Sequence, residues 1–397
     1  MVGAGAGFRG PVARPGRARV PKSRLVLLLG GGVGLLAGMW TGLSRAGLAV
    51  GTGPAAHHGV LMTLGFLGTL IALERAVAYR AGWGYVAPAL SGVSVVWLLA
   101  GGPVAGSGLL FVVAGVLVVV VYGHTWVAHR EPYLAIMGIG GLAWVVAALL
   151  WTVGASPIRL APILASFLVL TIVGERLELS RLRRPSRAAT RRLLAAIATF
   201  VAGVALTWFA REPGLVVAGI GLLATTAWFA RNDVARVTIR QPGLPRFAAV
   251  CMLAGYVWLA VGGALWIALG MRAGGALIHD AAVHAVFLGF VLSMVMGHAP
   301  IILPAVLRVA LPYRPVVWLP LVLLHVTVGM RVAADLSGSN WGRGVSAAGN
   351  VGALLLFVAV SIVIAYRGRR PSPREHPPNG STQSVRPPTP MEGGTTL

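Results

Sequence analysis

Apolar stretches of about 20 residues recur along this chain from Arg24 to Arg367. Because an α-helix rises about 1.5 Å per residue, each stretch is long enough to cross the hydrocarbon core of a bilayer. With 57% hydrophobic residues, 11% charged residues and a mean hydropathy of +0.81, the chain carries more apolar surface than a water-soluble domain can bury. The pattern predicts an all-α polytopic membrane protein.

The apolar stretches predict twelve transmembrane helices within a membrane domain at residues 24–366. We place them at 24–43, 55–79, 84–101, 106–126, 133–153, 157–178, 192–210, 214–231, 246–270, 280–306, 315–333 and 346–366. Residues 1–23 are rich in Gly, Pro and Arg, which predicts a disordered basic arm. Residues 367–397 are rich in Pro, Ser, Thr and Arg, which predicts a disordered tail.

The net charge of +23 is distributed as membrane topology requires. Arginines gather in alternate loops, with the run at 181–192 as the densest, while the intervening loops hold few. The positive-inside rule then predicts a multi-pass protein of the cytoplasmic membrane with both termini in the cytoplasm. Arginines at helix ends indicate the lipid bilayer as the partner and argue against nucleic acid.

Three of the expected helices share a local pattern. A small residue, Phe and an apolar residue stand eight residues before a polar position. The three copies are Gly65-Phe66-Leu67 before Glu74-Arg75, Ser166-Phe167-Leu168 before Glu175-Arg176, and Gly289-Phe290-Val291 before His298. They fall in the second, sixth and tenth helices, which predicts three four-helix units in a pseudo-threefold arrangement.

Histidines open the second and tenth of these helices at matching depth near the outer surface. His57 and His58 diverge by about 100° on a helix, so only one of them can face an interior site, and the stripe through Gly65 favours His58. His284 lies one turn after Asp280, whose carboxylate can accept the ring N–H and orient the imidazole. Paired imidazoles inside a membrane suggest iron or copper, and the alternative is that they are interfacial histidines whose tips reach water.

Each of the other polar groups inside the expected helices has two possible roles. His298 and His325 form a possible second metal site, or are histidines hydrogen bonded within the bundle. Glu74 and Glu175 are candidates for a proton route, or are interfacial ion pairs with the arginines that follow them. The single cysteine, Cys251, excludes an internal disulfide and an iron–sulfur cluster. The chain contains no phosphate-binding loop and no Cys-x-x-Cys-His motif for covalent haem.

A resemblance to known families rests on two of these helices. The His-rich opening His57-His58 followed by Gly65-Phe66, and His284-Ala285 followed by Gly289, resemble motifs of the NnrS family of membrane haem and copper proteins linked to nitric oxide. Twelve helices with histidines on the second and tenth are also similar to the large subunit of haem-copper oxidases and nitric oxide reductases. The resemblance implies haem b held by His58 and His284, with His57 as the substitute for His58, and a role with nitric oxide or an electron donor.

The chain departs from these families in ways that bear on function. Its sixth and seventh helices contain no histidine, so the copper site of the oxidases is not supported. The further Gly-His motif of NnrS proteins is present only as Gly297-His298-Ala299-Pro300. A secondary transporter with His and Glu coupling groups is the alternative function, and a metal-delivery factor is a third. Enzymatic activity and catalytic residues are not assigned by the sequence.

Overall fold

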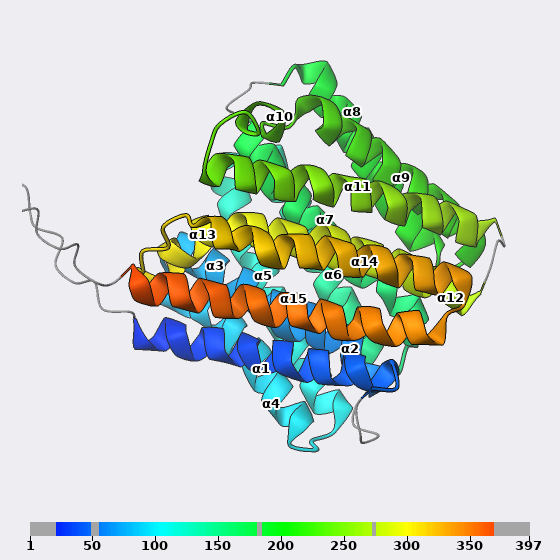
Figure 1. Cartoon of the computed structure of the whole chain (residues 1–397), viewed down its shortest axis with the longest axis horizontal. Helices are drawn as coiled ribbons and strands as arrows, with labels where there is room; N and C mark the ends of the chain where they lie inside the picture. The colour runs from blue at the N-terminus through cyan, green and yellow to red at the C-terminus, as the bar shows by residue number, and fades with distance from the viewer. Residues whose placement is uncertain (1–20, 49–54, 181–184, 272–274, 369–397) are drawn as a thin grey trace, which may run out of the picture.

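The computed structural model describes residues 21–48, 55–180, 185–271 and 275–368, and these residues form helices joined by short turns (Figure 1). No strand occurs in these ranges. The first helix begins at Lys22 and the last ends at Arg367. The arm predicted at 1–23 and the tail predicted at 367–397 therefore lie almost wholly outside the described residues.

The prediction of twelve membrane-spanning helices is confirmed, since twelve helical segments of the described chain are long and apolar enough to cross a membrane. Eight are single α-helices: Lys22–Arg45 (α1), Val104–His129 (α5), Pro132–Thr152 (α6), Pro157–Ser180 (α7), Arg187–Leu206 (α8), Arg211–Asn232 (α9), Leu244–Gly270 (α11) and Asn340–Arg367 (α15). Two begin with a 3-10 turn: Gly82–Tyr85 (η3) with Val86–Leu99 (α4), and Pro315–Val317 (η6) with Trp318–Ser337 (α14).

The second and tenth spans each change helix type in their buried middle. The second span consists of His58–Val60 (α2), the π-helix Leu61–Gly68 (η2) and Thr69–Tyr79 (α3), preceded by the 3-10 turn Ala55–His57 (η1). The tenth consists of Ala276–His284 (α12), the π-helix Ala285–Leu292 (η5) and Ser293–Leu307 (α13). Single-turn π segments are rare and are often found at functional sites. The same number of residues separates Leu61 from Ala285 and Gly65 from Gly289, so the two π-helices occupy matching positions in the sequence.

Most consecutive spans pack against each other, and the first lies beside the last, because α1 contacts α15 (Figure 1). Three spans form the interior: α2 contacts α7, α7 contacts η5, and α3 contacts α13. Every residue from Leu160 to Gly174 of α7 is buried, as expected for a helix that is apolar on all sides and surrounded by other helices. The second, sixth and tenth spans therefore meet at the centre of the bundle.

A short helix, Ala235–Thr238 (α10), links α9 to α11 at the end of the bundle where α8 begins. Its position is fixed by Asp233, whose buried carboxylate accepts hydrogen bonds from the backbone N–H of Ala235 at 2.7 Å and from the hydroxyl of Tyr256 at 2.7 Å. Arg176 binds the same carboxylate through Nε at 2.9 Å and Nη2 at 2.5 Å. This bidentate ion pair joins α7 to the loop after α9 inside the bundle.

Candidate functional site

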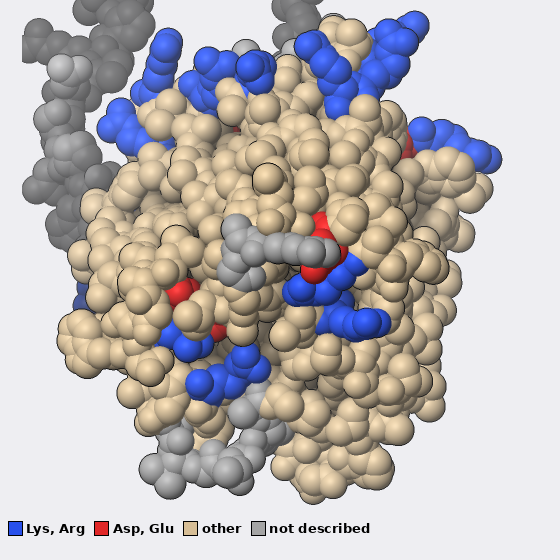
Figure 2. Space-filling view, turned by 90° about the vertical axis from the view of Figure 1, so that its right-hand side faces the viewer, with Lys and Arg blue, Asp and Glu red and all other residues tan. Residues whose placement is uncertain are grey.

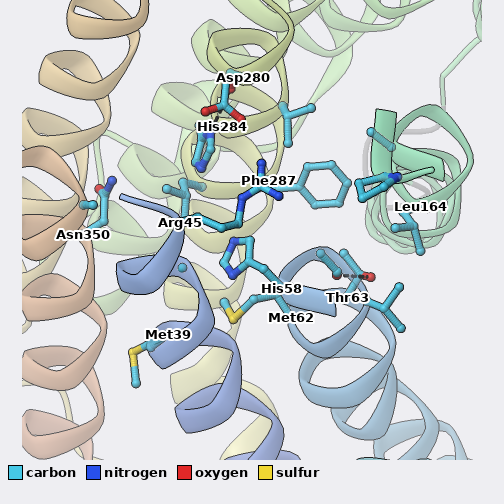
Figure 3. Close-up of a pocket in the computed structure, with 18 of the residues that line it drawn as sticks. Met39, Arg45, His58, Met62, Thr63, Leu164, Asp280, His284, Phe287 and Asn350 are labelled. Atoms are coloured by element: carbon cyan, nitrogen blue, oxygen red, sulfur yellow. Dashed lines mark hydrogen bonds and ion pairs between the residues drawn. The ribbon is translucent and has the colours of Figure 1, made fainter. Parts of the chain in front are cut away.

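A cavity of about 280 Å³ lies at the end of the bundle where α1 ends and where α2, α12 and α15 begin (Figure 3). Its volume is slightly below the range that is usual for small-molecule sites, about 300–1,000 Å³. Much of the wall is apolar, including Met39, Met62, Leu67, Leu164, Phe287 and Leu292. The polar lining comes from histidine, arginine and aspartate side chains near the mouth. Apolar walls with a few converging polar groups are typical of cofactor and ligand sites.

His58 lines this cavity and its ring is fixed by the first helix. Its Nδ1 lies 2.8 Å from the carbonyl oxygen of Gly38, 20 residues earlier on α1. A carbonyl oxygen only accepts, so Nδ1 carries the hydrogen, and the neutral imidazole keeps a lone pair on Nε2. The ring can lie this close to α1 because residue 42 is glycine: a Cβ added to Gly42 would be 2.9 Å from Cε1 of His58.

His284 lines the same cavity from α12 and its ring is fixed in the same manner. Its Nδ1 lies 2.7 Å from the backbone carbonyl oxygen of Asp280, one helical turn earlier. Nε2 of the neutral ring therefore also keeps its lone pair. In Figure 3 the rings of His58 and His284 face a common space, and the Arg45 side chain extends into that space between them. The structure thus brings together the two histidines that we predicted to be haem ligands.

In the structure the backbone carbonyl of Asp280, and not the carboxylate that we expected, accepts the hydrogen bond from the ring of His284. The carboxylate Oδ1 lies 4.0 Å from Nδ1 of His284, while Oδ2 accepts from Nη2 of Arg331 at 2.6 Å and from Nη2 of Arg343 at 3.0 Å. Two guanidinium groups attract a carboxylate far more strongly than a neutral imidazole does. The carboxylate therefore turns to the arginines.

Arg331 and Arg343 also bind Asp335, which completes a four-membered ionic cluster at the mouth of the cavity. Nε of Arg331 lies 2.9 Å from Oδ2 of Asp335, and Nε of Arg343 lies 2.9 Å from its Oδ1. Figure 2 looks onto this end of the bundle and shows acidic and basic side chains in contact on a mostly uncharged face. Ligand atoms of Asp280, His284 and Asp335 lie within 4.8 Å of one another, but two guanidinium groups already neutralise both carboxylates, which disfavours a metal cation there.

Arg331 and Asp335 were not predicted as site residues, although the sequence contains a signal for them. Both stand in the second half of the apolar span Pro315–Ser337, and charges inside a span mark partners or functional sites. His279 was also missed. Its side chain is 8% exposed and lines the cavity, one residue before Asp280.

His57 does not line the cavity. Its ring packs edge-on against Trp151 at 5.4 Å between ring centroids, on the side of α2 that faces α6. The divergence of adjacent residues on a helix therefore separates the two histidines, with His58 turned to the cavity and His57 to an aromatic neighbour.

His298 and His325 do not form the predicted second metal site. In His325, Nδ1 accepts a hydrogen bond from Nε1 of Trp258 at 2.9 Å, and Nε2 lies 3.3 Å from the hydroxyl of Ser293, so neither nitrogen is left for a metal. Nδ1 of His298 lies 2.8 Å from the carbonyl oxygen of Met294, one turn earlier. The two rings have different neighbours, because His325 is oriented by α11 and His298 by its own helix.

Glu74 and Glu175 lie together, at the end of the second and sixth spans opposite the cavity. Both pair with Arg75: Nη2 contacts Glu74 and lies 3.4 Å from Oε1 of Glu175. The two Glu-Arg pairs that the sequence suggested are therefore not equivalent, because Arg176 turns away to Asp233. Sixteen residues of helix separate Glu74 from His58, roughly 24 Å, so neither glutamate contributes to the cavity.

Arg45 is the cavity-lining cation whose charge is not balanced within the described residues. Its guanidinium forms no ion pair there, whereas Arg331 and Arg343 share two carboxylates. The cavity therefore combines two imidazole nitrogen lone pairs, an apolar wall and one excess positive charge. A flat apolar group with acidic substituents and a metal that accepts nitrogen ligands matches these features.

Comparison with known proteins identifies the family of this chain. The model of the family described as "Domain of unknown function (DUF8744)" matches residues 24–366, which is the whole membrane domain. No curated protein and no solved structure matches the chain.

Proposed function

Since the chain belongs to the DUF8744 family, whose description names no function, we propose from the cavity itself that this protein binds haem b within the membrane. The observation that carries the proposal is that His58 and His284 are held alike. Each donates its Nδ1–H to a backbone carbonyl and keeps Nε2 for the same apolar cavity. Hydrogen bonding of the other ring nitrogen is the usual condition of a metal-binding histidine, since it sets the tautomer and the ring orientation.

The residues present fit a haem. Imidazole nitrogens are axial ligands of haem iron, the aliphatic and aromatic wall suits a porphyrin, and the unbalanced charge of Arg45 suits a propionate. When bound, haem supplies a one-electron redox centre or a site for nitric oxide. The chain's own residues orient the ligand nitrogens through Gly38 and Asp280, and they exclude water with the wall of the cavity.

Ligation by both histidines would leave no open coordination position on the iron, which favours electron transfer. Ligation by one histidine would leave a position for nitric oxide. We therefore propose electron transfer or a nitric oxide response as the role, without a copper centre. The sixth span is α7 and the seventh is α8, and neither contains the histidines that the oxidases use for copper.

Secondary transport is the weaker proposal. Glu74 and Glu175 share Arg75 at the far end of the bundle, and both nitrogens of His325 are hydrogen bonded. Coupling groups act where they adjoin the transported solute, so their separation from the cavity argues for haem.

We extend the proposal to the arrangement of the helices and to their orientation in the membrane. We infer three related four-helix units, supported by the contacts among the second, sixth and tenth spans and by the matching positions of η2 and η5. The sixth span has no π-helix and instead carries Pro162. The arginines gathered at the end where α8 begins support a cytoplasmic location for that end, and with it for both termini.

The test is the visible spectrum of the purified protein in oxidised and dithionite-reduced forms, after expression with ample haem supply. A Soret band that is lost in His58→Ala and in His284→Ala, and retained in His57→Ala and His298→Ala, is the expected result. His57 is the matched control because it adjoins His58 in the chain and packs against Trp151. A colourless wild-type protein that elutes as a single folded species would refute the proposal.

A further inference from the structure

Seven exposed arginines lie on one part of the bundle end opposite the cavity, and we call this region the α8–α11 basic surface. They come from the start of α8, the end of α9, α10 with the loop after it, and the start of α11. The seven are Arg187, Arg191, Arg192, Arg231, Arg236, Arg240 and Arg246. In Figure 2 basic side chains crowd the upper edge of the molecule, where Figure 1 places α8 and α10.

Packing holds these segments side by side. Nε1 of Trp228, in the last turn of α9, donates to the carbonyl oxygen of Ala189, in the first turn of α8, at 2.7 Å. The α10 segment is fixed by the buried carboxylate of Asp233, and α10 contacts α11. The arginines of four segments are therefore brought to one surface by the fold.

Few acidic side chains accompany these seven arginines on their own segments. Between residues 185 and 271 the acids are Glu212, at the start of α9 and thus at the other end of that helix, and Asp233, which is buried and bound to Arg176. Three of the arginines donate to backbone carbonyl oxygens, each at 3.2 Å: Nη1 of Arg231 to Ala227, Nη1 of Arg236 to Arg231, and Nε of Arg246 to Ile239. Each of these guanidinium groups uses one nitrogen in this way and keeps its other N–H groups for an anion.

Exposed apolar side chains lie close to these arginines. Val237 of α10 is 48% exposed between Arg236 and Arg240, and Leu194 of α8 is 38% exposed close to Arg191 and Arg192. A surface that mixes arginines with exposed aliphatic groups at the end of a membrane bundle suits the headgroup region of a bilayer.

We propose that the α8–α11 basic surface binds the phosphates of anionic phospholipids in the adjacent leaflet. Charge complementarity carries the choice of partner, because seven exposed guanidinium groups on segments that hold only two acids, Asp233 and Glu212, attract anionic headgroups over zwitterionic ones. Exposed arginines on the rest of this end, such as Arg80, Arg130 and Arg308, lie at the C-terminal ends of three separate helices, α3, α5 and α13. The proposal does not depend on haem.

Native mass spectrometry of the full-length protein in mild detergent tests it, with equal amounts of dioleoyl phosphatidylglycerol and dioleoyl phosphatidylcholine as probes. We expect wild type to retain phosphatidylglycerol preferentially. We expect R236Q/R240Q/R246Q to lose at least about two thirds of the bound anionic lipid, since each basic residue near an anionic surface contributes to the attraction. R187Q/R191Q/R192Q, on the other side of the surface, serves as a second variant in case the first does not fold.

The matched control is R80Q/R130Q/R308Q, which removes three exposed arginines from the same end of the bundle. We expect it to retain phosphatidylglycerol as wild type does. Equal retention of both lipids by wild type would overturn the proposal and leave an acidic partner protein as the candidate for this surface. Equal losses in the control and in the surface variants would also overturn it, because they would indicate a general effect of net charge.

Discussion

The imidazole of His58 rests against Gly42 of α1, where a Cβ on residue 42 would be 2.9 Å from Cε1 of the ring. Gly42→Ala should therefore displace the ring from the carbonyl of Gly38 and weaken haem binding by about tenfold, the lower range for loss of support to a metal-binding histidine. Haem titration of the apoprotein measures the effect. Gly32→Ala on the same helix is the control, because a Cβ there meets nothing within 4 Å. Equal affinities of the two variants would contradict the role of Gly42.

Asp280→Asn should leave haem binding within about threefold of wild type. The ring of His284 is held by the backbone carbonyl of residue 280, which the substitution retains, while the carboxylate serves Arg331 and Arg343. If the carboxylate oriented the ring directly, its loss would weaken haem affinity by about 10–100-fold. Haem titration distinguishes the two cases, with His284→Ala as the variant that should lose binding.

Arg176→Met should destabilise the protein strongly. The substitution removes the guanidinium that binds the carboxylate of Asp233, which is 0% exposed, and breaking a buried ion pair costs about 3–5 kcal/mol. The melting temperature in detergent should fall, and Arg176→Met/Asp233→Asn should recover part of the loss because the buried charge is gone. Arg191→Gln on the exposed start of α8 is the control and should change the unfolding free energy by less than about 0.5 kcal/mol. If Arg176→Met and the control had equal melting temperatures, the ion pair between Arg176 and Asp233 would contribute nothing to stability.

His325→Ala should lower stability without changing the haem spectrum. It removes the acceptor of the Trp258 Nε1–H and the neighbour of Ser293, and an unpartnered buried donor costs about 1–3 kcal/mol. Thermal unfolding and the reduced spectrum, recorded on the same sample, separate the two effects. Loss of the Soret band in this variant, with the fold intact, would place His325 in a cofactor site after all.

Much of the fold was predictable because the membrane imposes a simple rule. A backbone in hydrocarbon must satisfy its own hydrogen bonds, so each apolar stretch of sufficient length becomes a helix, and the lengths alone predicted all twelve spans. The choice of His58 over His57 for an interior site also followed from helical geometry. The π-helices within the second and tenth spans were not predictable, since their sequences read as ordinary apolar helix.

The site was only partly predictable, because its polar partners come from distant helices. Sequence proximity suggested that the Asp280 carboxylate serves His284 and that Arg176 serves Glu175. Packing instead brings Arg331 and Arg343 to Asp280, and Asp233 to Arg176. A buried charge pairs with the opposite charge that the fold places nearest to it. The spacing of residues along one helix does not predict which residues of other helices will lie beside it.

The sequence by itself determined the class of protein, the number of spans and the place of the two histidines toward the starts of their spans, because these depend on hydropathy and on the helical rise per residue. Only the tertiary structure decided that His58 and His284 share one cavity, that backbone carbonyls fix both rings, and that Arg45 lines the same space. These relationships depend on how helices far apart in the chain pack against each other. That packing is governed by the shapes of side chains in contact, including the missing Cβ of Gly42, rather than by the order of residues along any one helix.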